Sequence, residues 1–238
     1  GHYFKVVNMS IGGTTFKDIK GFKPGKEQEL LTKLSQFCTQ RKRKEVMPWL
    51  PEKDYTQIKL NPTKQQLKAL KELADYFETG DVITQGILDR IVRYRQICLH
   101  PPLLNIPGNS PKLDWIVQYL KDYPEKPVII FSKFTSFLLE LYDKIKNENV
   151  GVIIGETRPE VRTELVKDFQ KGKLKVILIQ IDAGKEGLTL DKAEVEIFCD
   201  KYPPVGDIAQ AEDRFVATDI SKADKPHEII ELILKGTY

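Results

Sequence analysis

A short loop with two glycines is the part of the sequence best suited to contact a phosphate. Gly184 and Gly187 flank Lys185 in the run AGKEG, which follows the apolar segment KVILIQI. Glycine has no Cβ, so backbone N–H groups can point toward an anion, and the lysine adds a positive charge. A loop with two glycines after a strand is more often an ordinary turn. Both interpretations stay open at this point.

A single arginine near the end of the sequence also needs a partner. Arg214 lies in the run QAEDRFVATD, together with Gln210 and directly after Asp213. A guanidinium group is permanently charged and presents a planar fork of donors that fits a phosphate or a carboxylate. The partner is therefore either an anionic ligand or a nearby acidic residue such as Asp213 or Asp200.

Complete catalytic motifs are absent from the sequence. No GxxxxGK[ST] run occurs, because Glu186 follows Lys185 where that loop needs Ser or Thr for magnesium. No GxGxxG opens a strand, and the spacing suggests neither a Ser/His/Asp nor a Cys/His arrangement, nor an acidic pair for a metal. We therefore expect the chain by itself to be inactive as an enzyme.

Composition limits the remaining possibilities. With 238 residues, 41% of them hydrophobic, the chain can form one large domain or two small ones. The formal charge of +3 is too small to indicate nucleic-acid binding, so any binding surface has to be local. Three widely spaced cysteines predict reduced, mostly buried thiols and no zinc site. No apolar run is long enough to span a membrane, and we expect no membrane partner.

Two parts of the chain differ in their pattern. Residues 1–106 predict a helical connecting segment: an irregular start over 1–23 with a short strand, three helices, and a strand ending at Leu60. In residues 107–238, short apolar strands alternate with amphipathic helices, which is typical of a parallel sheet covered on both faces. The predicted fold class is α/β, an open doubly wound and mainly parallel sheet. The expected strands are at 128–131, 150–154, 175–181, 195–199 and 227–234, and the expected helices begin near 111, 134, 160 and 207.

In such a fold, ligands bind outside the carboxyl ends of the strands. The loops expected there are 131–136, 155–160, 181–190 and 199–204.

Six segments in unbroken order carry a resemblance to a known family. From residue 37 onward the sequence resembles the Swi/Snf-type ATP-dependent DNA translocases, a branch of the superfamily-two helicases, with "VIIFSKF" similar to motif IV, "AGKEGLTL" to motif V and "QAEDR" to motif VI. The six segments are FCTQRKRKEVMPWLPEK (37–53), RYRQICLHPPLL (93–104), VIIFSKF (128–134), GETRPEVR (155–162), AGKEGLTL (183–190) and QAEDR (210–214).

This resemblance implies two RecA-like lobes that clamp ATP with Mg²⁺ between them and move along duplex DNA. The first lobe carries the phosphate-binding loop and the acidic magnesium motif, and neither occurs here. The chain would then be the second RecA-like lobe with its connecting segment, working with a first lobe of the same polypeptide. By the same resemblance, Gln210 and Arg214 would face the γ-phosphate, and Gly184 and Gly187 would line the same cleft.

For DNA, the resemblance points to the loops of motifs IV and V. Ser132, Lys133 and Arg158 would donate to phosphates, with Lys185 at the edge of the cleft, and Lys133 stands where the family has a glutamine. The dense basic run with Arg41 and Arg43 is either close to DNA or a solvated helix end. We interpret Arg95 and His100 as structural residues that pin a helix against the lobe.

One position departs from the family. A second arginine usually follows three residues after the first, and Ala217 stands there instead. The alternative is therefore a degenerate motor lobe that binds DNA or a protein without useful ATP hydrolysis. The spacing of the motifs favours a prokaryotic or viral protein located in the cytoplasm, or in the nucleus if it is eukaryotic, and we expect the isolated chain to be a monomer.

Overall fold

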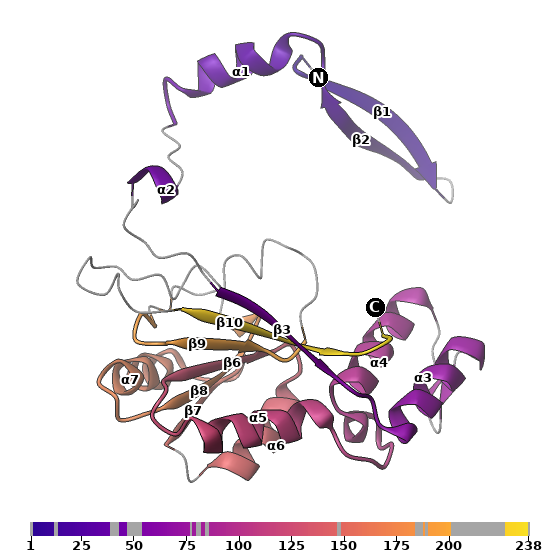
Figure 1. The fold of residues 1–238 in the computed structure, drawn as a ribbon. Helices are drawn as coiled ribbons and strands as arrows, with labels where there is room; N and C mark the ends of the chain where they lie inside the picture. The colour runs from indigo at the N-terminus through magenta and orange to yellow at the C-terminus, as the bar shows by residue number, and fades with distance from the viewer. Residues whose placement is uncertain are drawn as a thin grey trace. The chain divides into compact units, whose positions relative to one another are not determined.

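The computed structural model describes two compact units, Gly1–Pro48 and Trp49–Tyr238 (Figure 1). The residues it describes are 2–11, 14–38, 43–46, 54–76, 78–79, 82–83, 86–146, 149–183, 188, 190–200 and 227–237. None of the helices in these ranges combines the length and the apolar character needed to span a bilayer.

The first unit contains a β-hairpin followed by short helices. Strands β1 (Phe4–Ile11) and β2 (Thr14–Phe22) pair antiparallel, and α1 (Lys26–Leu34) and α2 (Arg43–Val46) follow. The prediction of an irregular start with one short strand was wrong here. Two glycines separate two runs rich in β-branched and aromatic residues, and this is the sequence signal of a hairpin.

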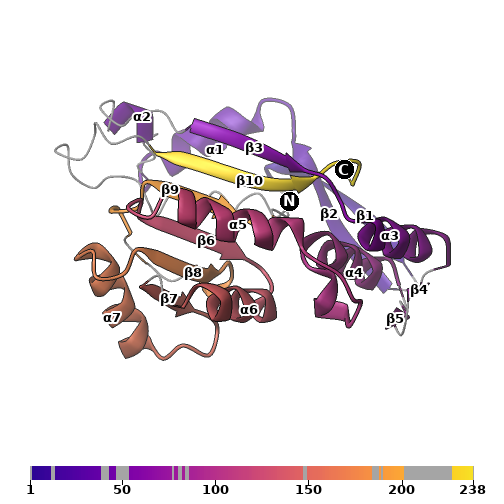
Figure 2. The same ribbon diagram turned by 60° about the horizontal axis from the view of Figure 1, so that its bottom comes forward.

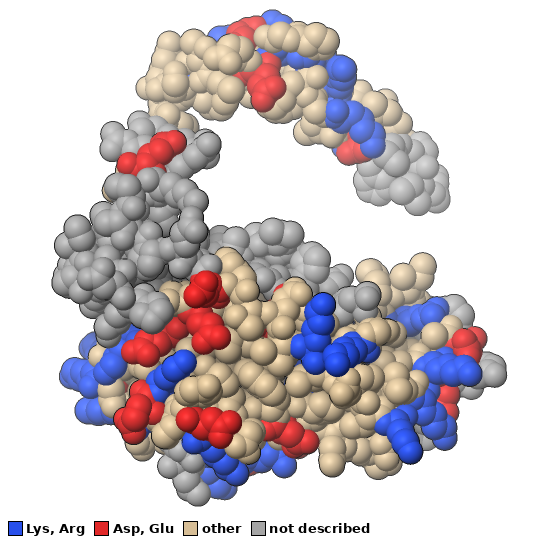
Figure 3. Space-filling model, viewed as in Figure 1, with Lys and Arg blue, Asp and Glu red and all other residues tan. Residues whose placement is uncertain are grey.

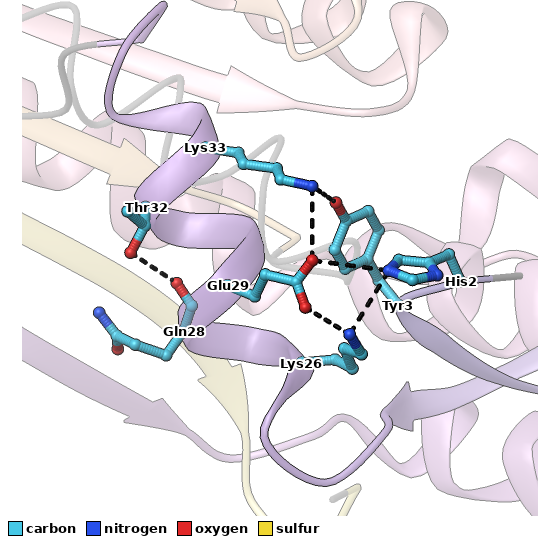
Figure 4. A network of polar contacts seen from close by, with 7 residues as sticks. All are labelled: His2, Tyr3, Lys26, Gln28, Glu29, Thr32 and Lys33. Atoms are coloured by element: carbon cyan, nitrogen blue, oxygen red, sulfur yellow. Dashed lines mark hydrogen bonds and ion pairs between the residues drawn. The ribbon is translucent and has the colours of Figure 1, made fainter.

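A polar network joins the hairpin end to α1 (Figure 4). The Glu29 carboxylate is paired with Lys26 and lies 3.4 Å from the Lys33 Nζ, which in turn donates to the Tyr3 hydroxyl at 3.0 Å. His2 Nε2 lies 3.5 Å from the same carboxylate. The hydrogen bond from Lys26 lowers the pKa of Glu29 to about 2. The network therefore links α1 to the residues just before β1.

The second unit is built on one six-stranded sheet whose neighbouring strands are all parallel (Figures 1 and 2). The strand order is β3-β10-β9-β6-β8-β7. This confirms the predicted α/β class with a mainly parallel sheet. The strands are β3 (Asp54–Leu60), β6 (Val128–Ser132), β7 (Val150–Ile153), β8 (Val176–Gln180), β9 (Val195–Phe198) and β10 (Glu228–Leu234).

Successive residues of the central strands pack into two separate cores, which is why these strands are apolar at most positions; the buried Glu196 of β9 is an exception. Ile130 of β6 faces the core formed with α5 (Pro111–Asp122) and α6 (Thr135–Ile145). Ile129 and Phe131 face the opposite core, which includes Phe169 of α7 (Pro159–Gln170). Because side chains alternate along a strand, a sheet with helices on both faces needs apolar residues at every position.

A third core lies beside the end of β10. It joins α3 (Lys64–Tyr76), α4 (Ile87–Leu99) and the short 3-10 helix η1 (Pro101–Leu104) to Leu234. The short strands β4 (Glu78–Thr79) and β5 (Val82–Ile83) lie between α3 and α4 in the chain.

The helical spacing of Leu67 and Leu70 predicts that both face the core of α3, and this is correct only for Leu70. Leu67 is 51% exposed, whereas Ala69, Leu70 and Leu73 are buried. The buried set includes a polar residue, Gln66, whose side chain donates to the Ile97 carbonyl at 2.9 Å. Ile83 and Ile87 stand at helical spacing, which predicts one helix for both, but Ile83 lies in β5 and Ile87 is 75% exposed.

The strand predicted to end at Leu60 is confirmed as β3, and it pairs with β10 in the main sheet. The sheet therefore includes residues from the segment that we expected to connect to the lobe. The division between residues 106 and 107 stays a prediction. Of the three free cysteines, Cys38 is exposed, and Cys98 and Cys199 are buried.

Candidate functional site

Three strand ends meet at the carboxyl edge of the sheet. β6 lies between β9 and β8, and backbone hydrogen bonds continue past the strands: Ile181 donates to the Ser132 carbonyl at 3.0 Å, and Cys199 to the Phe131 carbonyl at 3.0 Å. Residues 131–133, 181–183 and 199–200 are therefore held next to one another. This is where an open α/β sheet binds its ligands.

The Asp200 carboxylate is the centre of this edge. It is 4% exposed and lies 3.1 Å from the Arg95 Nη2. It also accepts the Lys133 backbone N–H, at 3.1 Å and 3.3 Å for its two oxygens, and a hydrogen bond from the Ser132 side chain. Burial raises the pKa of Asp200, and these partners oppose that rise. A buried carboxylate with this many donors is held in one orientation.

Lys133 reaches the surface of the same edge. Its ammonium group pairs with Asp182, and the two side chains are 44% and 38% exposed. An exposed pair of this kind contributes at most about 1 kcal/mol, so an anion with more than one acceptor can compete with Asp182 for the lysine. Ser132, in contrast, is fully buried, and its Oγ accepts the Phe134 backbone N–H at 3.2 Å. Its hydroxyl serves the turn that carries Lys133.

Arg158 lies on the loop after β7, where its residue caps the start of α7. The side chain is exposed. This loop belongs to the same edge of the sheet, because the Gly155 backbone N–H donates to the Gln180 side chain at the end of β8, at 2.9 Å. The structure thus brings Lys133 and Arg158 to one edge, on loops that follow two different strands.

A buried arginine of α7 fastens the neighbouring loop. The Arg162 guanidinium donates to the Ala183 carbonyl and to the Thr157 carbonyl, both at 3.4 Å. Ala183 is the last described residue before 184–187. Arg162 therefore holds the point from which the glycine loop starts. The sequence indicated Arg162 only as part of its similarity to the family.

Several predicted site residues lie outside the described residues. These are Arg41, Gly184, Lys185, Gly187, Gln210 and Arg214. Arg43 belongs to α2, but its side chain is outside the described part. Their roles stay predictions.

Sequence reasoning missed the charged pair at the centre of the edge. Arg95 and His100 were expected to pin the helix structurally, and they do contact the lobe: Arg95 through Asp200, and His100 through Glu140 of α6, at 2.6 Å. Asp200 was considered only as a partner for Arg214. The signal that could have found it is an acidic residue directly after the segment VEIFC, which the sequence predicts as a buried strand, because a buried carboxylate demands a cation.

Charges of both signs cover the visible face of the second unit (Figure 3). Lys and Arg gather over α3 and α4, and Asp and Glu are more frequent over the sheet. The surface has no single dominant sign on this face, which agrees with the small net charge and favours local contacts over long-range attraction of an anion.

A buried lysine next to the site predicts an unusual pH dependence of stability. Lys112 is 2% exposed and donates to the Cys199 carbonyl at 2.7 Å. Burial lowers its pKa below the ordinary value, while Asp200 acts in the opposite direction. The folded protein therefore binds this proton less tightly than the unfolded chain, so the charged lysine costs stability at neutral pH and the cost fades as the pH rises.

We expect the difference in free energy of unfolding between wild type and Lys112→Met to shift in favour of wild type as the pH rises toward 10.5, the ordinary pKa of a lysine. Urea unfolding at several pH values measures this difference. Lys121→Met, in the last turn of the same helix and exposed, is the control. A difference for Lys112→Met that falls as the pH rises would contradict the prediction.

The fold and this edge define a RecA-like lobe, and comparison with known proteins agrees. Residues 111–216 match the helicase conserved C-terminal domain. A solved Swi2/Snf2 ATPase core of Sulfolobus solfataricus in complex with double-stranded DNA superposes with a TM-score of 0.60 at 25% identity. The alignment covers 91% of this chain and 48% of that one. The C-terminal part of the Fun30 ATPase domain gives a TM-score of 0.60 at 19% identity, over 79% of this chain and 87% of that chain.

Curated relatives point the same way. An uncharacterized ATP-dependent helicase of Mycoplasma pneumoniae is 28% identical over 196 residues, which are 78% of this chain and 19% of that protein. A probable ATP-dependent DNA helicase of Arabidopsis thaliana is 26% identical over 201 residues, 75% of this chain and 19% of that protein. The chain thus spans about a fifth of the length of these relatives. Together these matches support a C-terminal lobe of a Snf2-type helicase.

Proposed function

We propose that the chain is the second lobe of an ATP-dependent double-stranded-DNA translocase, and that it supplies motifs IV, V and VI to an ATP cleft shared with a first lobe of the same polypeptide. The observation that carries this proposal is the junction at Asp200. There the turn of motif IV, the start of the glycine loop and the start of the segment with Arg214 lie side by side at the carboxyl edge of the sheet.

ATP is the substrate of this reaction, and Mg²⁺ accompanies it, held mainly by the first lobe. Gln210 and Arg214 are assigned to the γ-phosphate, where a planar and permanently charged donor stabilises the charge that develops during phosphoryl transfer. Gly184 and Gly187 are assigned to the wall of the same cleft. The chain by itself is expected to be inactive, since the residues that hold most of the nucleotide are on the other lobe.

Duplex DNA is the proposed partner of the loops after β6 and β7. Lys133 and Arg158 are the exposed cations that the structure places there, and Ser132 positions the turn from beneath. Lys185, Arg41 and Arg43 are further proposed contacts. Such contacts to phosphates read no sequence, and they weaken as the salt concentration rises.

Removal of the Lys133 ammonium group tests this assignment. In the whole protein, we expect Lys133→Ala to weaken duplex binding equally for unrelated sequences. It should also reduce the slope of log affinity against log salt by about one, because one phosphate contact is lost. Fluorescence anisotropy of a labelled duplex at several salt concentrations measures both quantities.

Lys146→Ala is the matched control, because Lys146 follows the end of α6 and is exposed. Helix α6 starts at the carboxyl edge of the sheet and ends near the opposite edge. Replacement of Lys146 should leave the slope of log affinity against log salt unchanged. An unchanged slope for Lys133→Ala would remove Lys133 from the DNA interface.

A second candidate function rests on Ala217. Without the second arginine, the lobe could bind DNA or a protein while hydrolysing little ATP. A whole protein that binds duplex DNA but shows no DNA-stimulated hydrolysis would establish this alternative. We also propose a prokaryotic or viral source with a cytoplasmic location, or a nuclear one if the protein is eukaryotic. The isolated chain is proposed to be a monomer.

A further inference from the structure

A buried ion pair joins a helix to the end of a strand that comes 105 residues later in the chain. The Arg95 Nη2 lies 3.1 Å from the Asp200 Oδ2, and the two side chains are 9% and 5% exposed. We propose that Asp200, held by Arg95, is a positioning residue that keeps the turn at Lys133 in one fixed geometry and fixes the point from which the chain continues toward Arg214. The inference rests on the proposed function, since it assigns a role within the same ATP-driven cycle.

Asp200 holds the turn after β6. Both oxygens of Asp200 accept the Lys133 backbone N–H, and the Ser132 hydroxyl adds another hydrogen bond. Ser132 in turn accepts the Phe134 N–H. One carboxylate from the end of β9 therefore determines the backbone direction at which Lys133 leaves β6.

Arg95 is oriented by its packing against the same turn. Its guanidinium carbon lies 5.4 Å from the centre of the Phe134 ring. Arg95 therefore packs against Phe134, which belongs to the turn that Asp200 holds. A lysine at position 95 keeps the charge but loses both the planar fork and the packing on the ring. The arginine is therefore specific to this arrangement.

The chain connects Asp200 directly to the segment that contains Arg214. Asp200 directly precedes residues 201–226, which include Gln210 and Arg214. Arg95 belongs to α4, which is held to α3 and to the end of β10 through the third core. A displacement of Asp200 changes the point from which that segment starts, and misplacement of a reacting group by about 1 Å can cost about a hundredfold in rate.

The experiment compares Arg95→Lys with wild type in the whole protein. We expect the kcat of DNA-stimulated ATP hydrolysis to fall about ten- to hundredfold, with the KM for ATP changed by less than about twofold. Amide hydrogen exchange should become faster at Lys133 and Phe134. Asp200→Asn, which keeps the size of the side chain, should lower kcat in the same way.

Arg93→Lys is the matched control. Arg93 lies on the same helix and pairs with Asp89 at 3.2 Å and with the Gln96 side chain at 3.1 Å, within α4. Its replacement should change neither kcat nor the exchange rates at the turn. Circular dichroism verifies that all variants are folded.

The outcomes separate this inference from the proposed function. If wild type hydrolyses ATP and both Arg95→Lys and Asp200→Asn keep the wild-type kcat, the positioning role is wrong. If wild type does not hydrolyse ATP, the proposed function fails, and the amide exchange rates then test the positioning role by themselves. Faster exchange at Lys133 and Phe134 in Arg95→Lys then supports the positioning role in a binding lobe, and unchanged exchange overturns it.

Discussion

Replacement of Arg214 by alanine is expected to lower ATP hydrolysis by the whole protein about 10³-fold or more, in the presence of saturating duplex DNA. A guanidinium group at the γ-phosphate stabilises charge that is present mainly in the transition state, so kcat should fall much more than the affinity for ATP. Arg214→Lys should recover little of the rate, because an ammonium group cannot reproduce two parallel hydrogen bonds. Steady-state phosphate release over a range of ATP concentrations separates kcat from KM.

The control for Arg214→Ala is Arg93→Ala, which removes an arginine that pairs within α4. DNA binding by Arg214→Ala should remain close to wild type, since the proposed DNA contacts lie on other loops. A variant that hydrolyses ATP within about twofold of wild type would show that Arg214 is not the residue at the γ-phosphate. The partner of Arg214 would then be a side chain of this lobe.

The second large effect is on stability. Phe131→Ala should lower the free energy of unfolding of the second unit by about 3–5 kcal/mol. The Phe131 side chain is 1% exposed, and its ring stacks on Phe198 with centroids 4.9 Å apart. The loss is large because the neighbouring strands cannot close the resulting cavity, and it is a substantial part of the stability of a typical domain.

Urea unfolding followed by circular dichroism measures this change. Leu139→Ala, on α6 and 44% exposed, removes a side chain of similar apolar character from the surface, and it should cost less than about 1 kcal/mol. Equal losses for the two variants would contradict the packing described here. Because Phe131 and Phe198 lie one and two residues before Ser132 and Asp200, a folded Phe131→Ala protein should also have a less ordered turn at Lys133.

The strands of the sheet could be predicted because their burial leaves little freedom of composition. A segment such as VIIF has apolar residues facing both cores, so that it is recognisable without its neighbours. The hairpin of residues 4–22 lacked this signal. Val6, Val7 and Ile19 are exposed, and lysines are interspersed with them, so the side chains that the structure describes here do not form an apolar face that marks the strands.

The site was only partly predictable for a different reason. Lys133 and Arg158 could be placed at the carboxyl edge because both follow recognisable strands. The pairing of Arg95 with Asp200 depends on two residues far apart in the chain, and no local pattern relates them. The burial of Gln66 on α3 was missed in the same way, because its side chain is satisfied by a carbonyl of α4 that the sequence alone does not bring near.

The pairing of β3 with β10 has a consequence for how the protein is made. Residues 54–60 form an edge of the sheet, and their partner strand is residues 228–234, near the other end of the sequence. During synthesis, β3 leaves the ribosome long before β10 exists, so the backbone groups of β3 that pair with β10 stay unpaired until β10 has been made. Contacts this distant in sequence slow folding, and a nascent chain that stops before residue 228 exposes an unpaired strand and invites association with other chains.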